Sequence, residues 1–197
     1  MSDRPSLVLA TRNRHKLREF ARLLAPAGIA VVALPDGVEL PPEVGETFAD
    51  NALPKARAAA AATGRIAIAD DSGIEADALA GRPGVRSARY AGEHATDEEN
   101  LAKLMAQAPA GSGLRYVCAL AYVDPGEAVE RVFFGYCSGK LASEPRGTGG
   151  FGYDPAFLPD GNHDGKTMGE LSAVDKDAIS HRGAAVRALV RWCGGAR

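Results

Sequence analysis

The feature that most constrains the fold is a repeated exchange between short apolar runs and segments with the spacing of an amphipathic helix. Residues 7–10 form an apolar run of strand length, and apolar residues then recur at helical spacing over residues 17–24. A second apolar run covers residues 29–34, and the alanine-rich residues 47–64 have strong helix propensity. This alternation predicts an α/β fold, because strands separated by helices usually form a sheet that helices cover.

Later segments predict further helices and an antiparallel pair of strands. Residues 114–123 and 128–137 are rich in β-forming residues, and the turn sequence DPGE between them predicts a hairpin. Residues 95–107 begin with the spacing of a capping box, and residues 180–193 repeat apolar residues at helical spacing. We therefore expect a mixed sheet. The glycine- and proline-rich residues 139–165 are expected to form a loop.

Proline also bears on the alanine-rich helix. Thr47 can cap this helix, but Pro54 lies in its interior, where a missing N–H is expected to kink or break the helix. The 197 residues suit one domain, residues 1–197, of ordinary globular composition.

Composition excludes several functional classes. A formal net charge of −2 argues against a broadly basic nucleic-acid surface, and no apolar run is long enough to cross a membrane. The amino-terminal segment does not have the pattern of a signal peptide. Three widely spaced cysteines without a CxxC pair favour a reducing, cytoplasmic location.

Two neighbouring carboxylates follow the apolar run IAIA, at Asp70 and Asp71. Adjacent like charges repel and are costly to bury, so such a pair usually has a cation to compensate it. Successive strand residues point to opposite faces, so one acid is expected to act chemically and the other structurally. The alternative is a strand that ends in an Asp-Ser-Gly turn with solvated acids.

The segment TRNRHK places four basic residues between the first strand and the first helix. In α/β proteins, loops at this position bind ligands, and the amino terminus of a helix attracts phosphate. The alternative is a solvated basic turn.

The segment GTGGFG, residues 147–152, matches the G-x-G-x-x-G dinucleotide pattern. It continues into Tyr153-Asp154-Pro155, where a helix cannot start cleanly, so a dinucleotide site is not expected. Glycines beside aromatic rings do allow a flat nucleobase to approach closely. Together with a phosphate loop and an acidic pair suited to a divalent cation, they indicate a nucleoside triphosphate. Lys176, His181 and Arg182 could add donors, or could be ordinary surface cations near a helix.

Six blocks follow one another along the sequence: LATRNRHKLREF, GETFADNALPKA, IADDSGIEADAL, PGVRSARYAG with ATDEENLAKL, GTGGFGYDPAF and KDAISHRGAA. In this order they resemble the pyrophosphatases of non-standard purine nucleoside triphosphates, the inosine triphosphate pyrophosphatase or XTP/dITP diphosphatase family.

The resemblance implies a two-lobed α/β domain with a central mixed sheet and an active-site cleft between the lobes. It implies hydrolysis of ITP, dITP and XTP to the monophosphate and pyrophosphate, with Mg²⁺ or Mn²⁺ as the metal and a homodimer as the assembly. Asp71 would be catalytic, with Asp70 as its structural partner, and Glu43 and Asp71 would bind the metal. Lys55 is a further residue that could face the phosphates. The substrate would be bound by Thr11, Arg12, Asn13, Arg14, His15, Lys16, Ser72, Phe151, Gly152, Tyr153, Asp154, Lys176, His181 and Arg182.

Three residues depart from the family pattern. Arg12 stands where a small residue or Asn is common, Pro42 where an acid is frequent, and Asp50 in place of the usual Glu. Two other functions are considered: a nucleotide pyrophosphatase with another base specificity, and a module that binds nucleotides without hydrolysing them. A panel of nucleotides with detection of pyrophosphate separates all three.

Overall fold

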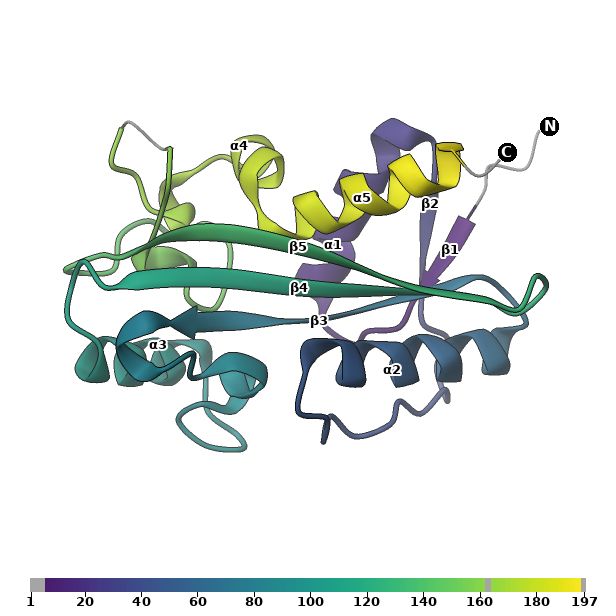
Figure 1. Ribbon diagram of the computed structural model, residues 1–197, viewed down its shortest axis with the longest axis horizontal. Helices are drawn as coiled ribbons and strands as arrows, with labels where there is room; N and C mark the ends of the chain where they lie inside the picture. Colours follow the sequence, from purple (N-terminus) through teal and green to yellow (C-terminus); the bar gives the residue numbers. More distant parts are fainter. Residues whose placement is uncertain (1–5, 162–163, 196–197) are drawn as a thin grey trace. The chain divides into compact units, whose positions relative to one another are not determined.

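The computed structural model describes residues 6–161 and 164–195, and its strands form a six-stranded sheet in the order β2-β1-β3-β4-β5-β6 (Figure 1). β1 pairs in parallel with β2 and β3, whereas β5 and β6 are antiparallel. The predicted α/β class with a mixed sheet is confirmed. The strands are β1 (Ser6–Leu9), β2 (Ala30–Ala33), β3 (Ala67–Ala76), β4 (Gly113–Asp124), β5 (Val129–Leu141) and β6 (Phe157–Pro159).

The α-helices lie close to the segments that the sequence predicts, except for the short α4. They are α1 (Arg14–Leu24), α2 (Phe48–Thr63), α3 (Asp97–Gln107), α4 (Ala173–Ile179) and α5 (His181–Gly195). α2 runs through Pro54 without a break, so the break that was one of the two expected outcomes does not occur. One proline removes one backbone hydrogen bond, and the alanine-rich turns and the capping box of Thr47 with Asp50 offset the loss.

The described residues divide into two compact units. The first unit comprises residues 6–71, 118–135 and 182–195, and the second comprises residues 72–117, 136–161 and 164–181. Each unit contains its own cluster of buried apolar side chains.

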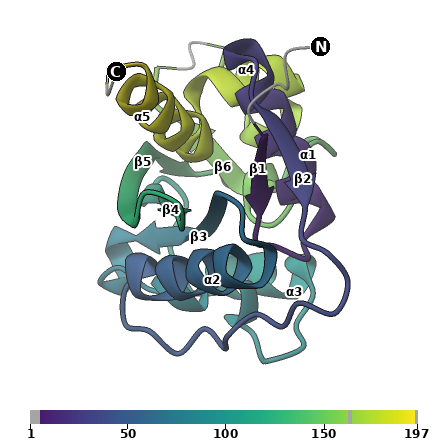
Figure 2. The ribbon, with the colours of Figure 1, turned by 90° about the vertical axis from the view of Figure 1, so that its right-hand side faces the viewer.

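In the first unit, helices cover both faces of the strands. Figure 2 shows α2 on one side of these strands, with α1 and α5 on the other. The alternation of side chains along β1 explains this arrangement, since Leu7 and Leu9 join a buried cluster with Phe20 of α1 and Leu189 of α5. β1 and the start of β3 are buried on both faces and read as continuous apolar runs, whereas β2 is partly exposed.

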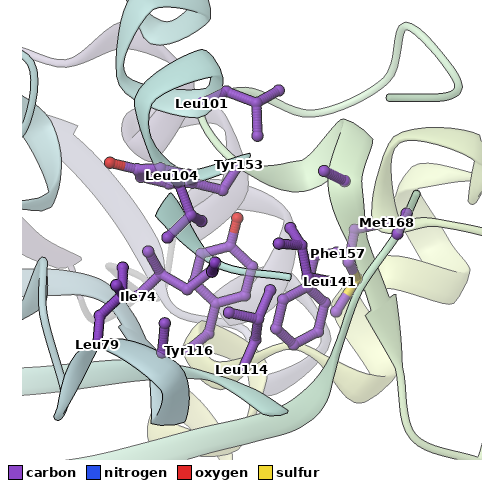
Figure 3. Packing of buried hydrophobic residues seen from close by; sticks show 14 of the residues in the cluster. Ile74, Leu79, Leu101, Leu104, Leu114, Tyr116, Leu141, Tyr153, Phe157 and Met168 are labelled. Atoms are coloured by element: carbon purple, nitrogen blue, oxygen red, sulfur yellow. The ribbon is translucent and has the colours of Figure 1, made fainter. Parts of the chain in front are cut away.

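In the second unit, the buried cluster joins α3 to the far ends of β3, β4 and β5. Figure 3 shows Leu104 of α3, Ile74 of β3 and Tyr116 of β4 within one packed group, together with Phe157 of β6. This core fixes the positions from which the surrounding loops leave the sheet.

Two expectations about strands need correction. β3 does not end at the acidic pair but continues through Asp70, Asp71, Ser72 and Gly73, so the predicted alternative of an Asp-Ser-Gly turn is wrong. Pairing within a sheet overrides local turn propensity here.

The predicted loop 139–165 also contains the end of β5 and the short strand β6, although Asn162 and His163 lie outside the described residues. None of the helices in the described part of the chain has the length and apolar character that a membrane span requires.

Candidate active site

The carboxylate of Asp71 lies on the α2 side of β3 and is buried. Asn51 donates a hydrogen bond from Nδ2 to Asp71 Oδ2 at 3.0 Å, and Lys55 Nζ lies 3.9 Å from Asp71 Oδ1. Burial raises the pKa of Asp71, and the negative charge of Glu43 raises it further, whereas Lys55 and the Asn51 hydrogen bond act to lower it. Asp71 is therefore a buried base with an increased affinity for a proton.

Lys55 contacts both carboxylates that the sequence analysis assigns to a metal. Its Nζ donates to Glu43 Oε1 at 2.5 Å and to the backbone oxygen of Asp70 at 2.9 Å, in addition to its contact with Asp71. Lys55 and Asn51 are separated by four positions in α2, so both point from one face of the helix. Two carboxylates sharing one ammonium leave a net negative charge at this point.

Asp70 points to the opposite face of β3, as the alternation of strand residues predicts. Its Oδ2 lies 3.1 Å from Lys16 Nζ of α1 and 3.4 Å from Arg182 Nε of α5. Arg182 also contacts Glu19 of α1, with Nη1 3.0 Å from Oε2. Two acids and two bases thus form a charge-balanced network in which Lys16 alone is partly exposed, and this fits a structural role for Asp70.

Residues 11–13 lead into α1, and the basic residues Arg14 to Lys16, expected to lie in a turn, form the first turn of this helix. Asn13 caps the helix, its Oδ1 accepting from the backbone N–H groups of His15 and Lys16. The Oγ1 of Thr11 accepts in turn from the Asn13 N–H at 3.1 Å. Arg14 and His15 are exposed, and Lys16 lies beside Asp70.

Arg12 has partners far along the chain. Its guanidinium donates to the carbonyl oxygens of Leu34, Pro35 and Val38 at 3.0, 3.0 and 2.8 Å. These residues begin the loop that carries Glu43. Arg12 therefore ties the segment that leads into α1 to the loop that carries Glu43.

The far end of the Glu43 loop is held by Asn51. Its Oδ1 accepts from the Gly45 N–H at 2.7 Å, while its Nδ2 donates to Asp71. One amide therefore fixes both the loop with Glu43 and the carboxylate of Asp71.

The second unit gathers most of the residues assigned to the base around Asp154. This carboxylate is 2% exposed and accepts from Lys176 Nζ at 2.6 Å, from the Phe151 N–H at 2.9 Å and from the Tyr116 hydroxyl at 3.1 Å. A Cβ at Gly150, whose φ is +74°, would lie 2.0 Å from Asp154 Oδ2, so only glycine fits there.

The loop around Phe151 is anchored at several further points. The Gly152 N–H donates to Asp97 Oδ2 at 2.8 Å, and the buried Tyr153 donates its hydroxyl to the Ser87 backbone oxygen at 2.7 Å. Lys176 Nζ lies 5.2 Å from the centre of the Phe151 ring. These contacts hold the Phe151 ring and the Lys176 ammonium as neighbours.

His181 joins this group through an aromatic stack. Its ring lies parallel to that of Tyr116, with centroids 4.6 Å apart and an interplanar angle of 7°. Ser72 follows Asp71 in β3 and is half-buried.

Four residues that contact the groups around Asp70, Asp71 and Asp154 are not predicted from the sequence. They are Glu19, Asn51, Asp97 and Tyr116. Signals for two of them exist in the sequence, since Glu19 is three positions from Lys16 and Asn51 four from Lys55, the spacings that share a helix face. Asp97 and Tyr116 reach partners 55 and 38 positions away, which no local pattern indicates.

Metal ligation depends on few protein groups. Within residues 6–161 and 164–195, no cluster of three or more His, Cys, Asp or Glu side chains could hold a metal ion. Glu43 and Asp71 both contact the Lys55 ammonium. Their carboxylate oxygens are the type of ligand that Mg²⁺ and Mn²⁺ prefer. The donor set fits a hard cation that takes its remaining ligands from elsewhere.

Comparison with known proteins agrees with the resemblance seen in the sequence. The model of the Ham1 family matches residues 7–192. A Frankia alni protein called dITP/XTP pyrophosphatase is 54% identical over 194 residues, covering 93% of this chain and 94% of its own. A Geobacillus kaustophilus protein of the same name is 48% identical over 190 residues, covering 93% of this chain and 91% of its own.

A solved structure gives the same result for the fold. The HAM1 protein from Coxiella burnetii is 38% identical, with a TM-score of 0.84, and the match covers 96% of this chain and 98% of that one. With a family model matching most of its length and relatives close to half identical, the chain belongs to the Ham1 family.

Proposed function

We propose that this protein hydrolyses the non-standard purine nucleoside triphosphates dITP, XTP and ITP to the monophosphate and pyrophosphate. The observation that carries the proposal is the buried Asp71, held by Asn51 and Lys55 with Glu43 on the same lysine. Relatives called dITP/XTP pyrophosphatase, among them one that is 54% identical, support the choice of substrate.

The phosphate chain is assigned to the first unit. Lys16, the exposed Arg14 and the positive end of the α1 helix dipole supply positive charge for phosphate oxygens. Mg²⁺, or Mn²⁺ in its place, would be held by Glu43 and Asp71 and would neutralise charge on the phosphates when bound. The two carboxylates and one ammonium of this group carry a net charge of about −1 by counting formal charges, which favours a divalent cation there.

Asp71 is assigned the role of general base. Its carboxylate accepts a proton from a water that attacks the α-phosphorus, and Asn51 keeps it oriented. The raised pKa of Asp71 suits this role, because a stronger base takes the proton more readily. Lys16 stabilises the charge that develops on the departing pyrophosphate.

The purine is assigned to the second unit, with Phe151, Lys176 and His181 as its principal partners. Hypoxanthine and xanthine carry a carbonyl at position 6, which accepts from an ammonium such as Lys176. Adenine carries an amino group there and leaves this donor unsatisfied. A site built on such a hydrogen bond rejects the mismatched analogue by up to about 10,000-fold.

The family resemblance also assigns Arg182 to binding of the base. Its Nε and Nη1 face the carboxylates of Asp70 and Glu19 in the first unit. We therefore assign Arg182 first to the support of Asp70, and its contact with the base stays a prediction that Arg182→Ala tests through the ratio of ITP to ATP turnover.

The proposal includes a homodimeric assembly and a cytoplasmic location for the protein. The family resemblance favours a homodimer, which sedimentation of the purified protein tests. The three cysteines are free, two of them buried, in keeping with a reducing cytoplasmic environment.

A panel of ITP, XTP, dITP, ATP, GTP, dUTP and TTP tests the activity. Release of pyrophosphate from the first three, only with Mg²⁺ present, supports the proposal. Preferred turnover of another base indicates a related pyrophosphatase, and binding without release of pyrophosphate indicates a nucleotide-binding module.

A further inference from the structure

We infer that Tyr116 is a positioning residue for purine recognition, acting through Asp154 and His181. This inference rests on the proposed function, because it assigns a task within the group of residues proposed to bind the base. Tyr116 lies in β4 and is 7% exposed, so its own contact with a ligand is small.

The hydroxyl of Tyr116 orients the carboxylate of Asp154. It donates to Asp154 Oδ1 at 3.1 Å, whereas Lys176 and the Phe151 N–H both donate to Oδ2. In the described part of the chain, Tyr116 is thus the sole donor to Oδ1. A carboxylate held through both oxygens cannot rotate freely, and its orientation decides where the Lys176 ammonium and the Phe151 backbone are held.

The ring of Tyr116 supports the imidazole of His181. It stacks on His181 with an interplanar angle of 7°, and the Phe157 ring lies 4.6 Å away at 39°. Figure 3 shows Tyr116 beside Phe157 within the buried cluster. The ring is therefore held by the core, and it gives the imidazole of His181 a fixed surface to lie on.

Two residues proposed to touch the base thus depend on one side chain that does not. The hydroxyl sets Asp154, and through it Lys176, while the ring sets His181. The Tyr116 hydroxyl donates to Asp154, the same carboxylate that holds Lys176, which is proposed to bind the base. A tyrosine that only filled the core would not need this particular acceptor. The arrangement predicts an effect on binding of the purine that is separate from any effect on stability.

Tyr116→Phe tests this by removing the hydroxyl and keeping the stack. We expect inosine monophosphate to bind about fivefold more weakly by calorimetry, the usual effect of losing one hydrogen bond. The KM for dITP and XTP should rise by a similar factor, with kcat within about twofold of wild type. Binding of inorganic tripolyphosphate, which lacks a base, should not change.

Tyr122→Phe is the matched control. Tyr122 lies on the same strand with the same 7% exposure, but its ring packs on Trp192 in the first unit. It should leave the affinity for inosine monophosphate unchanged. In a double-mutant cycle, Tyr116→Phe should add little to Asp154→Ala, because the alanine variant already lacks the acceptor for the Tyr116 hydroxyl.

Unchanged affinity for inosine monophosphate in Tyr116→Phe would overturn the inference. An equal loss of affinity for tripolyphosphate, or full additivity with Asp154→Ala, would overturn it as well. Failure of the proposed function looks different. In that case the wild-type protein releases no pyrophosphate from dITP or XTP, while the comparison of monophosphate binding still decides the role of Tyr116. A wild-type protein that does not bind inosine monophosphate overturns both.

Discussion

Two adjacent acids of one strand have different surroundings, and this difference separates their roles. Asp70 faces Lys16 and Arg182, which balance its charge, whereas Asp71 faces Asn51 and Lys55 on the other side of β3. The alternation of side chains along a strand is sufficient to predict this separation. The identity of the partners is not predictable in this way, since Arg182 lies 112 positions from Asp70.

Asp71→Asn should lower kcat by about 100- to 10,000-fold, because an amide cannot accept the proton of the attacking water. The same variant should melt at a higher temperature near neutral pH. Burial raises the pKa of Asp71 in the folded state, so ionisation of Asp71 opposes folding once the pH exceeds its unfolded pKa, and the amide removes this penalty. Calorimetry checks the stability, and turnover of dITP checks the rate. Near-normal turnover would remove Asp71 from the role of base.

Asn51→Leu should move the acid limb of the rate profile to higher pH. The hydrogen bond from Asn51 lowers the pKa of Asp71, so its loss raises that pKa and more of the base is protonated at a given acidic pH. The measurement is kcat as a function of pH. Asn100→Leu is the control, since Asn100 is also a buried helix residue that bonds to backbone groups, but in the second unit. An unmoved limb in Asn51→Leu would contradict the assignment.

The sequence predicts where helices begin better than it predicts where strands end. The capping boxes of Thr47 with Asp50 and Thr96 with Glu99 are local, and both helices begin where these patterns indicate. β3 passes through an apparent turn signal because its neighbours in the sheet pair with it. Contacts such as that of Tyr116 with Asp154 depend on the assembled sheet and have no local pattern.

The loop that carries Glu43 is held at its start by Arg12, and this contact has a measurable consequence. Arg12→Ala removes three hydrogen bonds to backbone oxygens of residues 34–38. Looser placement of Glu43 should raise the Mg²⁺ concentration for half-maximal activity by about tenfold, as changes beside metal ligands commonly do.

Titration of activity with Mg²⁺ checks this prediction. Arg65→Ala is the control, because Arg65 is an exposed arginine of the same unit that bonds Ser6. An equal Mg²⁺ requirement in Arg12→Ala and Arg65→Ala would show that the loop does not need this tie.

Two units with separate apolar clusters hold the two groups of residues to which the proposed function assigns the phosphates and the base. The first unit holds Asp71, Glu43 and Lys16, which suit phosphates and a divalent cation, and the second holds the group around Asp154, which suits a flat base. β3, β4 and β5 have residues in both units. Composition predicts only one domain, and the expectation of two lobes comes from the family resemblance, because each unit is assembled from segments far apart along the chain.

Hydrolysis of dITP in ¹⁸O-labelled water, with and without a chelator, tests the central claim most directly. Attack on the α-phosphorus predicts that the label enters the monophosphate and not the pyrophosphate, that a chelator abolishes the reaction, and that dATP reacts more slowly by about 100-fold or more. Label in pyrophosphate, release of orthophosphate, or equal turnover of dATP would contradict the account.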